Sequence, residues 1–196
     1  MAWINPVTLV GEYIILKPLD LNQAESLIEA VKDGELWKLW YTRVPSPDEM
    51  ITEIERRLFL QQQGSMLPFC VEDRASGKVL GMTTFMNIEE AHRRVEIGST
   101  WYRKSAQRTC ANTECKQLLL NHAFEALDCI AVEFRTSSFN FQSQNAIQRL
   151  GAKLDGVLRS HQIVKDDILR DTYVYSILKH EWAAVKLHLS WQMGKR

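Results

Sequence analysis

The stretch RVEIGSTWYRKSAQRTCANTECKQLLLNHAFEALDCIAVEFRT, residues 94–136, decides the fold. Its first part, residues 94–102, is rich in β-branched and aromatic residues and predicts a strand. Apolar residues at helical spacing predict a helix over residues 111–127, and residues 129–136 predict a second strand. Because a strand, a helix and a strand in succession form a right-handed crossover, we expect the two strands to be parallel.

The sequence on either side of this stretch supplies the other elements. Before it we expect a strand over 8–19, a helix over 21–32 capped by Asp20, a helix opened by the capping box at 46–49, and a hairpin of strands 68–73 and 79–88. After it we expect a helix over 140–150, strands over 152–164 and 169–178, and a terminal helix from about 180. The predicted class is α/β, a mixed and mostly antiparallel sheet of about seven strands with a central parallel pair and helices on both faces.

Composition limits the classes of function. The 196 residues are 45% hydrophobic and 24% charged, which suits one globular domain over residues 1–196. The formal net charge is zero, which argues against a nucleic-acid partner. No run approaches the roughly 18 apolar residues of a membrane span, and residues 1–6 do not resemble a signal peptide.

The four cysteines are not arranged as a C-x-x-C pair or with zinc-site spacing. We therefore expect reduced, structural thiols and no metal site. Taken together with the lack of a targeting or membrane segment, this predicts a cytoplasmic protein.

The loop before the long predicted helix is a candidate anion site. It comprises Gln107, Arg108, Thr109, Cys110, Ala111, Asn112 and Thr113. The first N–H groups of a helix are unpaired and its dipole is positive there, and Arg108 adds a cation. From the loop alone, an ordinary polar turn capped by Asn112 or Thr113 is the more common case.

Several motifs along the chain carry a family resemblance. They are Gly11-x-x-Ile14-x-Leu16-x-Pro18-Leu19, Gly77-Lys78-Val79-Leu80-Gly81, Glu96-Ile97-Gly98-x-Thr100-Trp101, Asn140-x-x-Ser143-x-x-Ala146-Ile147-x-x-Leu150-Gly151-Ala152, Gly156-Val157-Leu158-Arg159 and Arg170-Asp171-Thr172-x-x-Tyr175-Ser176-Ile177-Leu178. With these motifs the chain resembles the GNAT superfamily of N-acetyltransferases, and within it the RimJ/RimL-like branch of ribosomal-protein N-terminal acetyltransferases.

The resemblance implies that acetyl-coenzyme A is the co-substrate and that no metal takes part. It implies transfer of acetyl to a primary amine, either a peptide or protein N-terminus or a small molecule, by direct attack of the amine on the thioester. Contacts with the cofactor would come from the loop residues 107–113 and from Ile97, Gly98, Ser99, Asn140 and Ser143. Backbone N–H groups around residues 97–99 would stabilise the developing oxyanion.

Glu96 is the candidate general base and Ser143 a candidate acid for the leaving thiolate. Each has a structural alternative, since Glu96 could pair with Arg94 and Ser143 could satisfy N–H groups of a first helical turn. Asn140 could equally be a helix N-cap.

Trp37, Trp40 and Tyr41 lie between the first two predicted helices, where this fold builds its acceptor pocket. All three could instead belong to the core, which is the more common position of aromatic side chains.

The sequence departs from the family pattern in three places. Cys110 and Asn112 stand where the superfamily's pyrophosphate loop has small residues, and Ile147 stands where many members have a tyrosine as general acid. Phe139 and Phe141 flank Asn140, where polar residues are more usual in this branch. An alternative hypothesis is therefore a degenerate module of the same fold that binds coenzyme A or a protein without catalysis. An enzyme that modifies antibiotics or other small amines is a third. The sequence leaves open the acceptor, the pathway and whether the protein is a homodimer.

Overall fold

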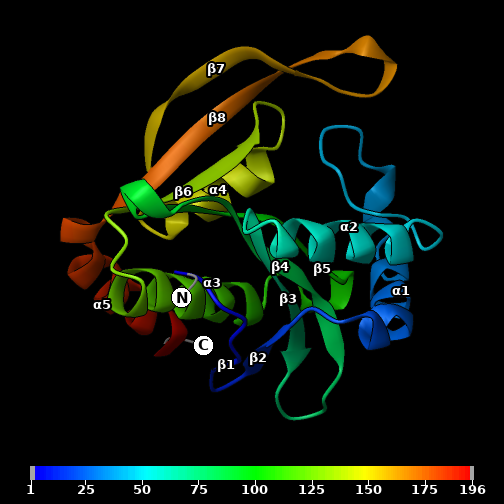
Figure 1. Cartoon of the computed structure of the whole chain (residues 1–196), viewed down its shortest axis with the longest axis horizontal. Helices are drawn as coiled ribbons and strands as arrows, with labels where there is room; N and C mark the ends of the chain where they lie inside the picture. The colour runs from blue at the N-terminus through cyan, green and yellow to red at the C-terminus, as the bar shows by residue number, and fades with distance from the viewer. Residues whose placement is uncertain (1–2, 195–196) are drawn as a thin grey trace.

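The computed structural model describes residues 3–194, except the side chain of Lys165, and within this range the chain forms one eight-stranded sheet (Figure 1). The strands are β1 (Leu9–Val10), β2 (Ile14–Pro18), β3 (Met66–Asp73), β4 (Val79–Glu89), β5 (Arg94–Tyr102), β6 (Ala131–Ser137), β7 (Lys153–Ile163) and β8 (Leu169–Leu178). The helices are α1 (Ala24–Lys32), α2 (Met50–Gln62), α3 (Ala111–Asn121), α4 (Phe141–Arg149) and α5 (Trp182–Gly194).

The strands follow the order β1-β2-β3-β4-β5-β6-β8-β7 across the sheet. Only β5 and β6 are recorded as a parallel pair, and every other neighbouring pair of these strands is antiparallel. This confirms the central parallel pair that the strand–helix–strand stretch predicts. The sheet has one strand more than expected because the predicted strand at 8–19 turns back on itself and becomes β1 and β2.

A buried carboxylate holds this first turn in place. Glu114, in the first part of α3, accepts hydrogen bonds from the backbone N–H groups of Glu12 (2.6 Å), Tyr13 (2.9 Å) and Ile14 (2.8 Å). A Cβ atom at Gly11 would lie 2.5 Å from the carboxyl carbon of Glu114, so this turn requires glycine. The N-terminal hairpin is thereby tied to the start of α3.

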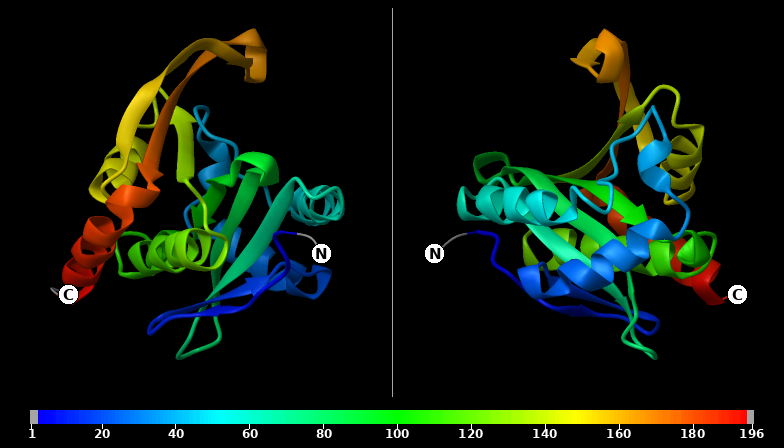
Figure 2. Two further views of the ribbon diagram at one scale, coloured as in Figure 1. Left: turned by 60° about the vertical axis from the view of Figure 1, so that its left-hand side comes forward. Right: turned by 90° about the vertical axis from the view of Figure 1, so that its right-hand side faces the viewer.

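Helices cover both faces of the sheet, as predicted (Figure 2). On one face α1 and α2 enclose a core that includes Leu27, Met50 and Ile54. On the other face α3, α4 and α5 pack over a larger core that includes Leu119 and Ile177. Among the described residues, no helix combines the length and the apolar character needed to cross a bilayer.

The helix ends follow local sequence signals, with two exceptions. Asp20 accepts from the Asn22 N–H at 2.8 Å and so caps the short 3-10 turn that leads into α1. At the second helix only half of the predicted capping box forms. Glu49 accepts from the Ser46 N–H at 2.9 Å, but the helix itself begins at Met50. The long central helix ends in a π-helical turn, His122–Ala126, rather than continuing as α-helix to 127.

Candidate functional site

The parallel seam between β5 and β6 is short. It pairs Arg94 with Ala131, Val95 with Val132, and Glu96 with Glu133. Beyond Glu96 and Glu133 the strands continue to their ends without further recorded pairs, and the two parts of the sheet diverge (Figure 2). The facing edges of β5 and β6 therefore offer backbone groups to an extended ligand rather than to each other.

A bulge shapes β5 directly beyond the seam. The register between β4 and β5 shifts between Met82 and Thr84, and Ser99 on β5 has a φ of 48°. The buried Arg57 of α2 holds this bulge by donating to the Ser99 carbonyl (3.1 Å) and to Thr84 Oγ1 (2.7 Å). Bulges of this kind are common next to active sites because they redirect a strand.

Glu96 is buried, with 5% of its surface exposed. Asn87 Nδ2 donates to its carboxylate at 2.6 Å, and Arg135 Nε lies 3.5 Å from the same oxygen. Burial raises the pKa of the Glu96 carboxyl, and the charge of Arg135 and the Asn87 hydrogen bond oppose that rise only in part. Arg94, the partner considered from the sequence, pairs instead with Glu133. A carboxyl group of raised pKa at the mouth of the opening suits proton transfer near neutral pH.

The position of the Glu96 carboxylate explains why residue 98 is a glycine. A Cβ atom at Gly98 would lie 2.9 Å from a Glu96 carboxylate oxygen and 2.7 Å from the Met86 sulfur. Gly98 therefore leaves room for the carboxylate and for the approach of a reacting group to the strand.

The predicted anion loop lies at the start of α3. Gln107 Nε2 donates to the Tyr102 carbonyl at 3.2 Å, and Arg108 is exposed with a φ of 62°. Thr109 Oγ1 accepts from the Ala111 N–H at 3.2 Å, and the N-cap position of α3 is Cys110 rather than Asn112 or Thr113. The exposed Arg108 and Thr109 beside a helix N-terminus fit a phosphate group.

The other loop residues have different surroundings. Ala111 and Thr113 are buried, and Thr113 Oγ1 accepts from Arg149 of α4 at 3.0 Å. Cys110 and Asn112 are half-buried at the start of the helix. Both side chains therefore remain at the surface of the loop. Ile147 does not face this region, because its side chain is buried in the core with 8% exposed.

Asn140 and Ser143 meet at the N-terminus of α4. Asn140 Oδ1 accepts from the Ser143 N–H at 3.0 Å and so caps the helix. This is the structural alternative noted for Asn140, and it leaves the half-buried Ser143 hydroxyl available for a further role. α4 follows β6 directly, so both residues lie on the β6 side of the opening.

The three aromatic residues separate into two groups. Trp37 is half-buried against the core under α1 and α2. Trp40, which is 56% exposed, packs on Phe139 with ring centroids 5.1 Å apart and makes an edge contact with Tyr41 at 5.8 Å. A small cavity of about 10 Å³ lies between Trp40, Tyr41, Ser137, Phe139, Val164, Ile168, Leu169 and Arg170.

Four residues of the site carry no role in the sequence prediction: Asn87, Arg135, Phe139 and Arg170. Alternation along a strand could have found Arg135, because it follows Glu133 by two positions and so shares its face. Asn87 could not have been found, because its position depends on the irregular end of β4, where its φ is 46°.

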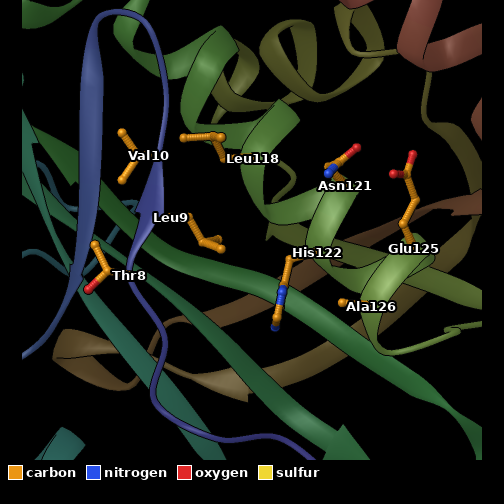
Figure 3. A pocket seen from close by; sticks show the side chains of 8 residues that line it. All are labelled: Thr8, Leu9, Val10, Leu118, Asn121, His122, Glu125 and Ala126. Atoms are coloured by element: carbon orange, nitrogen blue, oxygen red, sulfur yellow. The ribbon is translucent and has the colours of Figure 1, made fainter.

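A larger cavity of about 380 Å³ lies on the opposite face of the sheet (Figure 3). It is lined by Thr8, Leu9, Val10, Leu118, Asn121, His122, Glu125 and Ala126. The ring of His122 lies 6.2 Å from that of Phe85, which pairs with Ile97 and faces α3. Glu96 precedes Ile97 and points the other way, so this cavity is separate from the candidate site. Within the described residues, no three His, Cys, Asp or Glu side chains are grouped to hold a metal ion.

Comparison with known proteins defines the class. The family model "Acetyltransferase (GNAT) domain" matches residues 14–153, and the chain therefore belongs to the GNAT acetyltransferase family. Curated relatives include "Uncharacterized N-acetyltransferase p20" of Bacillus licheniformis, 27% identical over 90% of this chain and 98% of the relative. They also include "Putative ribosomal N-acetyltransferase YdaF" of Bacillus subtilis, 26% identical over 90% of this chain and 97% of the relative.

Solved structures agree on the fold. A GCN5-related N-acetyltransferase from Brucella melitensis superposes with a TM-score of 0.84 at 28% identity, covering 96% of this chain and 86% of that one. The ribosomal L7/L12 α-N-protein acetyltransferase RimL superposes with a TM-score of 0.78 at 19% identity, covering 89% of this chain and 96% of that one. The similarity to RimL shows the shared fold. The ribosomal N-acetyltransferase-like relatives that the sequence motifs indicate are thus among the matches.

Proposed function

We propose that this protein transfers the acetyl group of acetyl-coenzyme A to a primary amine, with residues 1–196 acting as one catalytic domain. The observation that carries the proposal is the position of Glu96. This buried carboxylate of raised pKa lies at the last pair of the seam, where β5 and β6 separate. Membership of the GNAT family supports acetyl-coenzyme A as the co-substrate.

Two regions bind coenzyme A in this proposal. The N-terminus of α3, with the exposed Arg108 and Thr109, faces the pyrophosphate. The open edges of β5 and β6, with Gly98 and Ser99 on the β5 side, receive the extended pantetheine arm. Asn140 and Ser143 border the same opening from α4.

The chemical step requires a neutral amine. Glu96 takes a proton from the ammonium group, directly or through water, and the freed amine attacks the thioester carbonyl carbon. A C–N bond forms, the C–S bond breaks and the coenzyme A thiolate leaves, while the nitrogen gives up its extra proton to the departing sulfur or to water. N–H groups of residues 97–99 stabilise the oxyanion that forms between these events. Ser143 is a candidate donor to the thiolate, although a thiolate also leaves without one.

Thermal denaturation and turnover assays test this proposal together. Acetyl-coenzyme A should raise the melting temperature, because a ligand selective for the native state stabilises it by about 2.7 kcal/mol at 100 times its Kd. A panel of amines, monitored by release of coenzyme A thiol, should contain at least one acceptor. An unchanged melting temperature at millimolar cofactor would remove the central claim.

A module that binds coenzyme A without catalysis is the second candidate. Cys110 and Asn112 in the anion loop and the core position of Ile147 favour it. Glu96→Gln is the matched control, since it should retain the thermal shift while losing turnover. Wild-type protein that shows the shift but acetylates none of the amines would support the binding module. The cytoplasmic location remains part of our proposal, and the four cysteines, none in a disulfide, are compatible with it.

A further inference from the structure

The sheet face that carries Glu96 continues through a row of polar side chains. Alternation places Glu133, Arg135 and Ser137 of β6 on this face, and Ser137 pairs with Thr172 of β8. Arg170 lies two residues from Thr172, so it extends the row to the cavity under Trp40. The row thus leads from the candidate base to one arginine.

Arg170 is incompletely satisfied. Its Nη1 donates to Gln162 Oε1 at 3.0 Å, whereas its buried Nε–H has no acceptor among the residues that the structure describes. Burial lowers the pKa of the Arg170 guanidinium, and the charge of Glu96 opposes this fall. A buried donor without an acceptor costs free energy, and a ligand that supplies an acceptor recovers it.

The net charge of this row of side chains is positive and favours an anion. Arg94 and Arg135 are in contact with Glu133, and Arg135 also with Glu96. With Arg170 the face carries three guanidinium groups and two carboxylates, an excess of one positive charge. Protonation of Glu96, whose pKa is raised, would increase that excess.

The walls of the cavity are apolar around this arginine. Trp40, Phe139, Ile168 and Leu169 surround it. The enclosed space of about 10 Å³ is close to that of one water molecule, so it can hold a single acceptor group such as a carboxylate oxygen, and the exposed ring of Trp40 lies at its edge. Desolvation by these rings strengthens a charge-assisted hydrogen bond at Arg170.

We propose that Arg170 binds a carboxylate of the acceptor, so that the substrates are amines that also carry a carboxylate. The acceptor's ammonium group would then lie toward Glu96 and its carboxylate toward Arg170. This inference rests on the proposed function and names the substrate class of the same site. An acidic residue at a peptide N-terminus and a free amino acid share this chemistry.

Pairs of acceptors that differ only in one charge test the proposal and distinguish the two classes of acceptor. One arm compares peptides that begin with Asp or Asn, and the other compares a free amino acid with its amide. We expect kcat/KM to favour the charged member of at least one pair by about tenfold or more, which corresponds to one charge-assisted hydrogen bond. A preference for Asp over Asn in the peptides alone would identify a peptide N-terminus as the acceptor. A preference for the free amino acid over its amide alone would identify a free amino acid as the acceptor.

Variants assign the preference to Arg170. Arg170→Gln should abolish it by raising KM for the charged acceptor with little change for the neutral one, and Arg170→Lys should keep part of it. Arg159→Gln is the control. Arg159 lies in the same hairpin, pairs with Asp171 and has an 81% exposed side chain, so its loss should leave the preference intact. Calorimetry of the pair that shows the preference, with coenzyme A present, gives a second readout, in which the charged acceptor binds more tightly to the wild type.

Two results would overturn the inference. One is equal or better use and binding of the neutral acceptors by the wild type. The other is an undiminished preference in Arg170→Gln. Failure of the proposed function looks different, since no amine of either kind would then be acetylated.

Discussion

The two parts of the sheet on either side of the seam differ in how they are covered. Nearly every residue of β3 is buried, because helices lie on both of its faces. Along β7 no residue is buried, and apolar side chains such as Ile163 (72% exposed) and Leu154 (50%) are open to solvent. The strands β2 to β5 therefore form a support that is packed on both faces, whereas β7 is an exposed edge strand beside β8, which carries the proposed recognition residue Arg170.

The proposed base, Glu96, belongs to the packed part of the sheet, and its loss should have the largest effect. Glu96→Gln should lower turnover at neutral pH by about 100- to 10,000-fold, the usual cost of removing a general base. Affinity for acetyl-coenzyme A, measured by calorimetry, should change little. Wild-type rates in this variant would return Glu96 to a structural role.

The pH dependence gives an independent check on the same residue. The wild-type rate should fall as the pH is lowered through the Glu96 pKa, which burial raises above the usual 4.5, because only the ionised carboxylate accepts a proton. The raised pKa also means that the folded state binds this proton more tightly than the unfolded state. The resulting stabilisation is present at acid pH and lost as the pH rises through the folded pKa. Glu96→Gln should therefore remain as stable as the wild type near neutral pH.

A pair of substitutions, one in the core and one in β7, tests the comparison itself. Phe85→Ala, at a fully buried position of β4, should reduce the free energy of unfolding by about 3–5 kcal/mol. Leu158→Ser in β7, where the side chain is 40% exposed, should change it by less than about 0.5 kcal/mol. Chemical denaturation measures both. Similar losses in the two variants would mean that β7 is as integral to folding as the support.

Of the three aromatic residues between α1 and α2, Trp40 should affect acceptor binding without affecting the cofactor. Trp40→Ala removes a ring that packs on Phe139 over the cavity, and should raise the acceptor KM by about tenfold. The KM for acetyl-coenzyme A should stay nearly unchanged. Trp37→Ala is the matched control, because that ring packs on the α1 and α2 core and should affect stability instead. A change in the cofactor KM with Trp40→Ala would contradict the acceptor role.

The smallest effect is expected in the anion loop. Cys110→Gly should preserve cofactor affinity or tighten it slightly, because glycine lets the backbone approach phosphate more closely. The start of the helix should survive the change, since Cys110 occupies the N-cap without a side-chain capping bond and the Ala111 N–H is bonded to Thr109 Oγ1. A collapse of affinity, measured by calorimetry, would show that the Cys110 side chain has a role of its own.

Most of the fold could be predicted from the sequence because its signals are local. The parallel pair follows from the order of strand, helix and strand, and the cap at Asn140 follows from residue type. The split of the first strand could not be predicted, because the turn depends on Glu114, which is about a hundred positions away in the chain.

The candidate site also has parts that local sequence predicts and parts that depend on how distant strands pair. The motif containing Glu96 could be recognised, and alternation along β6 could have placed Arg135 on one face of that strand. The ion pair itself could not be predicted, because it depends on the register that sets Glu96 opposite Glu133. Trp40 and Tyr41 could be proposed from their density in a loop, whereas Arg170 joins them only through the sheet order that places β8 beside β6.

The shortness of the seam has a consequence for how the chain folds during synthesis. β1 to β5 pair with strands that are their neighbours in the order of translation, so this part can assemble as it leaves the ribosome. The three pairs of the seam form only after α3 and β6 have emerged, and β8 must then pass between β6 and β7 in the sheet. The opening between β5 and β6 therefore cannot form until β6, which ends at Ser137, and α4, which ends at Arg149, have been synthesised. A nascent chain that carries only β1 to β5 has no binding cleft.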